Sequence, residues 1–137
     1  EYDADWNYLG EKEIFMKTST LSYSPDVIAG VMFDFHVKGF SALLQTQYVS
    51  SQYMTNARIE ALSLDAYCFT NLNLGYEFST ARTKKIRVGL QVNNLFNSEY
   101  CNNGYGYFSI VDGVRVDEAF YFPQAMLNVL ANVTVSF

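Results

Sequence analysis

The sequence predicts an all-β fold: an antiparallel, up-and-down segment of a transmembrane β-barrel, with about five spanning strands and an extracellular hairpin. Three observations predict it. Apolar and polar residues alternate in five segments, the links between the segments are either short or long, and no stretch approaches 18 consecutive apolar residues. A membrane-spanning helix is therefore not expected, whereas about 9 to 11 alternating residues suffice for a strand of a membrane barrel.

The clearest segment is LNVLANVTVSF at 127–137. Every second residue counted back from Phe137 is apolar, and the residues between them are small and polar except for Leu130. A period of two that is kept over eleven residues places one face of a strand in an apolar medium and the other face in water.

Four upstream segments repeat this alternation, at about 27–36, 40–48, 66–78 and 86–93. In the second of them Leu43 falls among the polar positions. The first is apolar on both sides in its first half, so the pattern does not fix which way that half faces. With the last segment, five strands of membrane-spanning length are predicted.

The links between these segments differ in length. Residues 36–39 form a tight turn with Gly39 at the position that tolerates a positive φ, and residues 79–85 form a short polar link. The links at about 49–64 and 94–124 are long. Short turns at one end and long loops at the other are typical of an outer-membrane barrel, with the short turns on the periplasmic side.

The second long link contains its own hairpin signal. Asp112 and Gly113 lie between valines, which predicts a type I′ turn. We therefore expect a two-stranded flap over about 105–121, projecting from the outer end of the sheet.

Composition adds two expectations about the surroundings of the protein. The chain has 11 Tyr, 11 Phe and one Trp, and many of these aromatics fall near the ends of the predicted strands, as in the two aromatic girdles of a membrane barrel. The alternative is that they fill a soluble core. A net charge of −5 without a basic tract disfavours nucleic acid as a partner.

The sequence offers no catalytic motif. It has no nucleophile with a nearby histidine and no glycine-rich phosphate loop, so no enzymatic activity and no cofactor are expected. Asp34 and the single histidine, His36, do not make a metal pair. Residues 1–13 hold five carboxylates but lack the spacing and central glycine of a calcium loop, which favours a solvated loop without metal.

Two strings closely resemble the carboxyl end of TonB-dependent outer-membrane receptors, particularly those of the Bacteroidetes type. They are VNNLFNSEYCNNGYGY at 92–107 and FYFPQAMLNVLANVTVSF at 120–137. The matching features are a strand that closes on NLFN, a following Tyr, a Pro-Gln segment and a terminal Phe. Here these are Asn94, Leu95, Phe96, Asn97, Tyr100, Pro123, Gln124 and Phe137. TLSYSPDVIAG at 20–30 and YVSSQYMTNA at 48–57 also fit, so the resemblance covers about residues 15–137.

The resemblance implies that this chain is part of a larger barrel protein. Receptors of this family form a 22-stranded barrel with a plug inside it. Residues 1–137 would then be the C-terminal part of the barrel domain, in the cell outer membrane, with the plug absent from this chain. The implied activity is energised uptake of a scarce nutrient such as an iron chelate, cobalamin or a glycan. The implied partners are the remainder of the barrel and its plug, the TonB complex acting through the plug, outer-membrane lipid and the barrel assembly machinery.

The resemblance also implies roles for three sets of residues. The residues expected to face the lumen are Asn71, Asn73, Glu77, Arg87, Gln91, Asn93, Asn128, Asn132 and Thr134. The long loops would cover the substrate entrance, and the aromatic residues expected to contact substrate there, or alternatively to pack the flap together, are Tyr105, Tyr107 and Phe108. The alternating final strand resembles a signal for barrel assembly, whose residues are Val133, Val135 and Phe137.

Two other classes of protein remain open. One is a self-contained small outer-membrane barrel of about eight strands, which counts residues 12–22 and the flap as spanning strands. The other is a soluble ligand-binding β-barrel, which would bury the apolar faces. Cys68 and Cys101 both fall at the outer, oxidising end, so a disulfide between them is a further alternative that the sequence leaves open.

Overall fold

The computed structural model describes residues 1–11, 13, 15, 19–80 and 84–136. In this part of the chain the regular structure is β-strand, apart from one turn of 3-10 helix, η1 (Glu60–Leu62). The expected all-β fold is therefore confirmed. No helix among the described residues is long and apolar enough to cross a membrane. The chain divides into two compact units.

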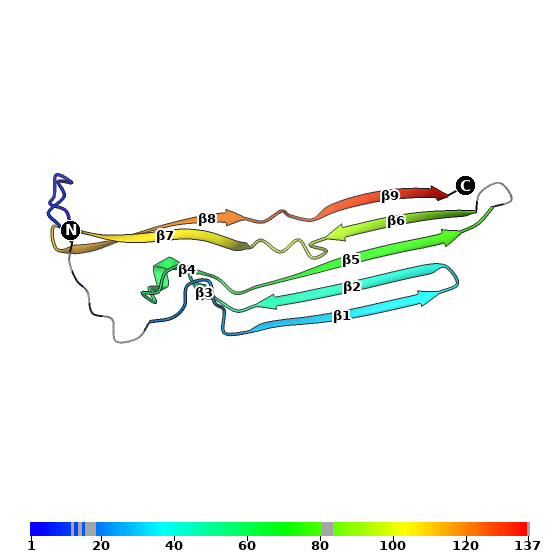
Figure 1. The fold of residues 1–137 in the computed structure, drawn as a ribbon, viewed down its shortest axis with the longest axis horizontal. Coiled ribbons are helices and arrows are strands. Elements are labelled where there is room, and N and C mark those ends of the chain that lie inside the picture. Colours follow the sequence, from blue (N-terminus) through cyan, green and yellow to red (C-terminus); the bar gives the residue numbers. More distant parts are fainter. Residues whose placement is uncertain (12, 14, 16–18, 81–83, 137) are drawn as a thin grey trace. The chain divides into compact units, whose positions relative to one another are not determined.

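Unit 2 comprises Val27–Val49, Cys68–Glu99 and Gln124–Phe137. It is a five-stranded sheet with the order β1-β2-β5-β6-β9, and neighbouring strands run in opposite directions (Figure 1). Each strand agrees with a predicted segment to within one residue at either end. The strands are β1 (Ile28–Val37), β2 (Phe40–Val49), β5 (Tyr67–Phe78), β6 (Lys85–Asn93) and β9 (Asn128–Ser136).

One face of this sheet is mainly polar. In the observed register Glu77 lies opposite Arg87, which lies opposite Thr134 on the next strand. Because side chains alternate along a strand, this register puts all the residues predicted to face a lumen on one side of the sheet. They are Asn71, Asn73, Glu77, Arg87, Gln91, Asn93, Asn128, Asn132 and Thr134.

The other face is apolar and uncovered. Val133 exposes 65% of its surface and Val88, opposite it, exposes 42%. Leu90 is exposed as well. Thr46 and Thr70 also lie on this face, and their hydroxyls bond to each other across β2 and β5, with an Oγ1–Oγ1 distance of 2.9 Å. The inward burial of apolar faces that a soluble barrel requires is not found in the described part of the sheet.

The sheet is open at both sides. Strands β1 and β9 are its edges, so the described residues do not close a barrel. At one end of the sheet Lys38 and Gly39 have φ of +43° and +83°, and Gly39 thus has the positive φ that was predicted. Strand β5 ends and β6 begins at this same end (Figure 1). The short connections therefore share one end of the sheet, as the sequence predicts.

Unit 1 comprises Glu1–Asp26, Ser50–Tyr67 and Tyr100–Pro123. Its main feature is the predicted hairpin, which is longer than expected and turns at Asp112 and Gly113 with φ of +48° and +75°, as a type I′ turn requires. The strands of the hairpin pair in a sheet of their own, which does not support counting the flap among the spanning strands of a small barrel. The strands of unit 1 are β3 (Gln52–Tyr53), β4 (Ser63–Leu64), β7 (Cys101–Val111) and β8 (Val114–Pro123).

The core of unit 1 lies between residues 50–67 and one face of the hairpin. Leu62 and Leu64 are fully buried, and the cluster around them includes Met54 and Ile59, with Phe108 and Ala119 of the hairpin packed against it. Two glycines of β7 allow this close approach. A Cβ on Gly104 would lie 2.5 Å from the Phe120 carbonyl oxygen and 2.9 Å from Met54 Sδ, and a Cβ on Gly106 would lie 2.8 Å from Leu62 Cδ2.

The Gly104→Ala substitution is expected to loosen unit 1. Its methyl group has no space between the hairpin and Met54, so we expect unit 1 to lose about 1–3 kcal/mol of stability. The measurement is hydrogen exchange of the β7 and β8 amides. Gly30→Ala is the matched control, since a Cβ there meets only the Thr46 carbonyl oxygen, at 3.8 Å. Unchanged protection of the hairpin amides in Gly104→Ala would contradict this account of the packing.

Candidate functional site

The polar face of unit 2 is hollowed into an open groove of about 450 Å³. Glycines help to form it: a Cβ on Gly75 would lie 2.5 Å from Ser41 Oγ, and a Cβ on Gly89 would lie 2.6 Å from Asn132 Oδ1. All five strands contribute polar side chains. These are Asp34, His36, Ser41, Asn73, Arg87, Gln91, Asn132 and Thr134.

Polar side chains on this face bond mainly to one another. Asn93 Nδ2 donates to Asn128 Oδ1 at 2.8 Å, and Gln91 Nε2 donates to Asn93 Oδ1 at the same distance. Lys85 Nζ lies 2.9 Å from Glu77 Oε2. The described residues contain no group of three or more His, Cys, Asp or Glu side chains able to hold a metal ion. The chemistry that this face offers is therefore hydrogen bonding.

The NLFN motif begins with a buried asparagine that acts as a structural clip. Asn94 is 3% exposed and has a φ of +52°. Its Nδ2 donates to the carbonyl oxygens of Ser98, at 2.9 Å, and Ala125, at 3.2 Å, and its Oδ1 accepts the Ser98 N–H at 2.9 Å. The side chain therefore joins the turn after β6 to the segment that leads into β9.

The neighbours of Asn94 extend this clip to a third strand. The Asn94 N–H donates to Asn71 Oδ1 at 3.0 Å, and the Leu95 N–H donates to the Thr70 carbonyl at 2.7 Å, both on β5. Asn97 Oδ1 accepts the Leu127 N–H just before β9. The motif thus positions the final strand, and Asn71 supports it from the polar face.

The residues expected to contact substrate do not all lie on the same face of the hairpin. Tyr105 and Tyr107 lie exposed on its outer face, where the Tyr105 ring stacks on Phe120 with centroids 4.8 Å apart and planes at 14°. The centroid of the Tyr107 ring lies 6.5 Å from that of Phe120, and the Tyr107 hydroxyl donates a hydrogen bond to the Glu118 carboxylate. Phe108 is on the opposite face and packs against the core of unit 1. The outer face therefore carries a short ladder of exposed rings without Phe108.

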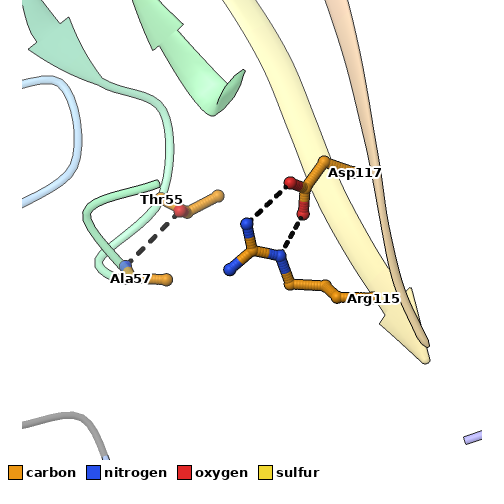
Figure 2. A network of polar contacts seen from close by, with 4 residues as sticks. All are labelled: Thr55, Ala57, Arg115 and Asp117. Atoms are coloured by element: carbon orange, nitrogen blue, oxygen red, sulfur yellow. Dashed lines mark hydrogen bonds and ion pairs between the residues drawn. The ribbon is translucent and has the colours of Figure 1, made fainter. Parts of the chain in front are cut away.

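The inner face of the hairpin carries a separate ion pair. Figure 2 shows Arg115 against the carboxylate of Asp117, near the turn where Thr55 Oγ1 accepts the Ala57 N–H. Arg115 Nη2 donates to Asp117 Oδ2 at 2.9 Å, and Arg115 Nε lies 2.9 Å from Oδ1 without the alignment of a hydrogen bond. The charge on Oδ1 is thus balanced by the guanidinium group of Arg115. Arg115 pairs with Asp117 on the inner face of the hairpin, whereas Glu118 lies on the outer face.

A cavity of about 640 Å³, open to solvent, lies within unit 1, between the N-terminal segment and the hairpin. The N-terminal segment is held at the hairpin tip, since the Tyr2 N–H donates to the Ile110 carbonyl at 2.8 Å. The rings of Trp6 and Tyr8 lie 5.9 Å and 5.6 Å from the Tyr2 ring, tilted by 48° and 60°. The lining includes Tyr2, Trp6, Tyr8, Glu11, Tyr107 and Glu118. Sequence analysis missed this site, because no local pattern relates the N-terminal aromatics to the hairpin.

Asp3 organises the loop that carries Trp6. Its Oδ1 accepts the N–H groups of Asp5, at 3.0 Å, and Asn7, at 2.8 Å, and its Oδ2 accepts Asn7 Nδ2 at 2.9 Å. These bonds, first the one from the Asn7 side chain, lower the pKa of Asp3 below its ordinary value. Trp6 is held at a φ of +62°, which is unusual for a bulky residue.

Two further sets of predicted residues can be placed. Val133 and Val135 lie on the apolar face of β9, opposite Val88 and Ile86, while Phe137 lies outside the described residues. Cys68 and Cys101 are both free thiols.

Replacement of Asn94 by Ala is expected to destabilise unit 2. The substitution removes three part-buried side-chain hydrogen bonds to the backbone of Ser98 and Ala125 and places Ala at a positive φ, so we expect a loss of about 2–4 kcal/mol. Denaturant unfolding followed by β-sheet circular dichroism measures it. Asn132→Ala, at an exposed position of the polar face, serves as the control. Equal stability of the two variants would contradict the stabilising role of the Asn94 side chain.

Acidification is expected to release the Asp3 loop. Because the folded-state pKa of Asp3 is lowered, its carboxylate stabilises the loop at neutral pH and loses this effect as the pH falls through that pKa, which lies below 3.8. The fluorescence anisotropy of Trp6 should fall in that range. In Asp3→Ala it should be low already at neutral pH, and in Asp5→Asn it should behave as in the unchanged chain. If Asp3→Ala keeps the full anisotropy at neutral pH, the loop does not depend on this carboxylate.

Comparison of the chain with protein-family models, with curated proteins and with solved structures finds no match. Its function is therefore argued from its own residues. They provide a sheet with one polar and one uncovered apolar face, and a second unit with an acidic, aromatic cavity.

Proposed function

We propose that this chain is the closing part of an outer-membrane TonB-dependent active transporter for a scarce nutrient. In this proposal the apolar face of unit 2 contacts lipid and its polar face lines the lumen beside a plug. The iron chelates, cobalamin and glycans implied by the resemblance are the candidate nutrients. The TonB complex supplies the energy for uptake by acting on the plug.

The observation that carries the proposal is the uncovered apolar face of a sheet whose strands are 9 to 12 residues long. A contiguous apolar surface of this kind is rare on soluble monomers. It matches the lipid-facing band of a membrane barrel, whose strands need about 9 to 11 residues. Phe35, Phe40, Tyr76 and Phe78 gather on this face near the short turns, where a barrel carries an aromatic girdle.

The open edges support a larger assembly. An unpaired strand edge within hydrocarbon leaves backbone N–H and C=O groups without partners, at several kcal/mol for each group. Strands β1 and β9 are such edges in the described sheet. Further strands, from the remainder of the same barrel, would satisfy both of them. Edge pairing at β9, with Val133, Val135 and Phe137, would also suit recognition by the barrel assembly machinery.

Unit 1 fits the role of the cover over the substrate entrance. It is built from the segments that connect β2 to β5 and β6 to β9, together with the N-terminal residues. These connections leave the sheet opposite the short turns, and in an outer-membrane barrel that end faces the outside. The exposed ladder of Tyr105, Tyr107 and Phe120 then offers rings to a ligand that arrives from outside.

Two neighbouring substitutions in β6 test the proposal. Leu90 lies on the apolar face opposite Leu74 and Ala131, and Gln91 lies on the polar face. In lipid, Leu90→Arg should destabilise the barrel by about 2–4 kcal/mol, whereas Gln91→Arg should be nearly neutral. The measurement is the amount of folded, heat-modifiable protein in the outer-membrane fraction of producing cells. Equal recovery of both variants, or recovery of both in the soluble fraction, would contradict the proposal.

A further inference from the structure

The charge of the chain is concentrated in unit 1. Eleven of the 14 acidic residues fall within its bounds, against four of the nine basic residues, so unit 1 has a net charge of −7 and unit 2 a net charge of +2. A ligand that approaches unit 1 therefore meets a negative potential, which favours cations and repels anions.

The arginines of unit 1 do not neutralise the cavity. Arg115 is paired with Asp117 on the inner face of the hairpin, and Arg58 lies over the Tyr53 ring, 5.9 Å from its centroid. Lys12 and Lys17, the remaining basic residues of the unit, lie outside the described residues. Among the described residues that line the cavity, the charged side chains are carboxylates, including those of Glu11 and Glu118.

The aromatic residues of the cavity are arranged differently from those of the ladder. Tyr105 and Phe120 are nearly parallel and make a flat platform, whereas Trp6 and Tyr8 are tilted against Tyr2 by 48° and 60° and so bound a hollow. Trp6 and Tyr8 expose 59% and 62% of their surfaces, which leaves ring surface free for a ligand. Ring faces attract cations through their quadrupole.

We propose that this cavity binds a small organic cation of the quaternary ammonium class, with the rings of Tyr2, Trp6 and Tyr8 around its alkyl groups and the carboxylates of Glu11 and Glu118 opposite its charge. Tilted rings combined with carboxylates are the usual surroundings of such cations. An anion would find no described basic side chain in the lining. A neutral sugar could also stack on these rings, so the test below includes methyl glucoside as a competitor.

The site adds a charge preference to the proposed transporter, but its test does not depend on transport or on membrane insertion. Trp6 is the single tryptophan of the chain, so its fluorescence reports on the cavity alone. The probe is choline, added to the chain in a detergent with neither choline nor sugar headgroups. The comparison ligand is the neutral isostere in which a tert-butyl group replaces the trimethylammonium group. Failure of choline binding would leave the Leu90 and Gln91 comparison unaffected.

We expect choline to change Trp6 emission saturably and to bind at least about tenfold more tightly than the neutral isostere. Glu118→Gln should weaken choline binding by about fivefold or more through the loss of its charge. Asp112→Asn is the matched control: it removes the same charge from unit 1 at the hairpin tip, outside the cavity, and Asn tolerates the φ of +48° there. This control should leave binding within about twofold.

A third variant tests the rings. Tyr8→Leu keeps an apolar side chain at an exposed position but removes the aromatic face, and should weaken choline binding by about threefold or more with little change for the neutral isostere. Equal affinity for choline and the isostere would overturn the proposal, as would displacement of choline by methyl glucoside or the absence of any saturable response. The two-ligand comparison uses the unchanged chain, so it stands even if a variant does not fold.

Discussion

The structure depends on one constraint: unit 2 has an apolar face that nothing in the described chain covers, and strand edges that nothing in it pairs. Alternation separates the two faces apart from a few apolar residues on the polar side, such as Ile28, Met32 and Leu130, and the register keeps the faces aligned between β1 and β2 and from β5 to β9. Val88 and Val133 are adjacent and both exposed. An uncovered apolar face of this size needs an apolar partner, which in the proposed function is hydrocarbon, and strand edges within hydrocarbon need further strands to pair with. The proposed location and assembly both follow from this requirement.

Unit 1 meets a different requirement, because long connections must be ordered by contacts of their own. Leu62 and Leu64 supply a small core, and Gly104 and Gly106 let the hairpin approach it closely. This packing directs Phe108 inward, and alternation along the same strand directs Tyr105 and Tyr107 outward. Core and exposed aromatic surface are thus two sides of a single hairpin.

The strands could be predicted from the sequence because alternation is local: each predicted strand of unit 2 agrees with the observed one to within one residue at either end. The packing of residues 50–67 on the hairpin could not be predicted, since it joins segments that share no periodic pattern. The opposite facing of Phe108 and Tyr107 could have been predicted, because neighbours in a strand point to opposite faces. The cavity beside Trp6 depends on a loop held by the Asp3 carboxylate. It brings the N-terminal segment together with the hairpin, two segments that lie far apart in the sequence.

The most direct test of the central claim is a scan of β9 with single spin labels in membranes from producing cells, with Cys68 and Cys101 replaced. Collision with oxygen, which dissolves in lipid, is compared with collision with a water-soluble nickel reagent. The account predicts oxygen maxima at Val129, Ala131, Val133 and Val135, and nickel maxima at Asn128, Leu130, Asn132 and Thr134. Labels at Val129, Ala131, Val133 and Val135 that are shielded from both reagents would instead place that face in a protein core and contradict the account.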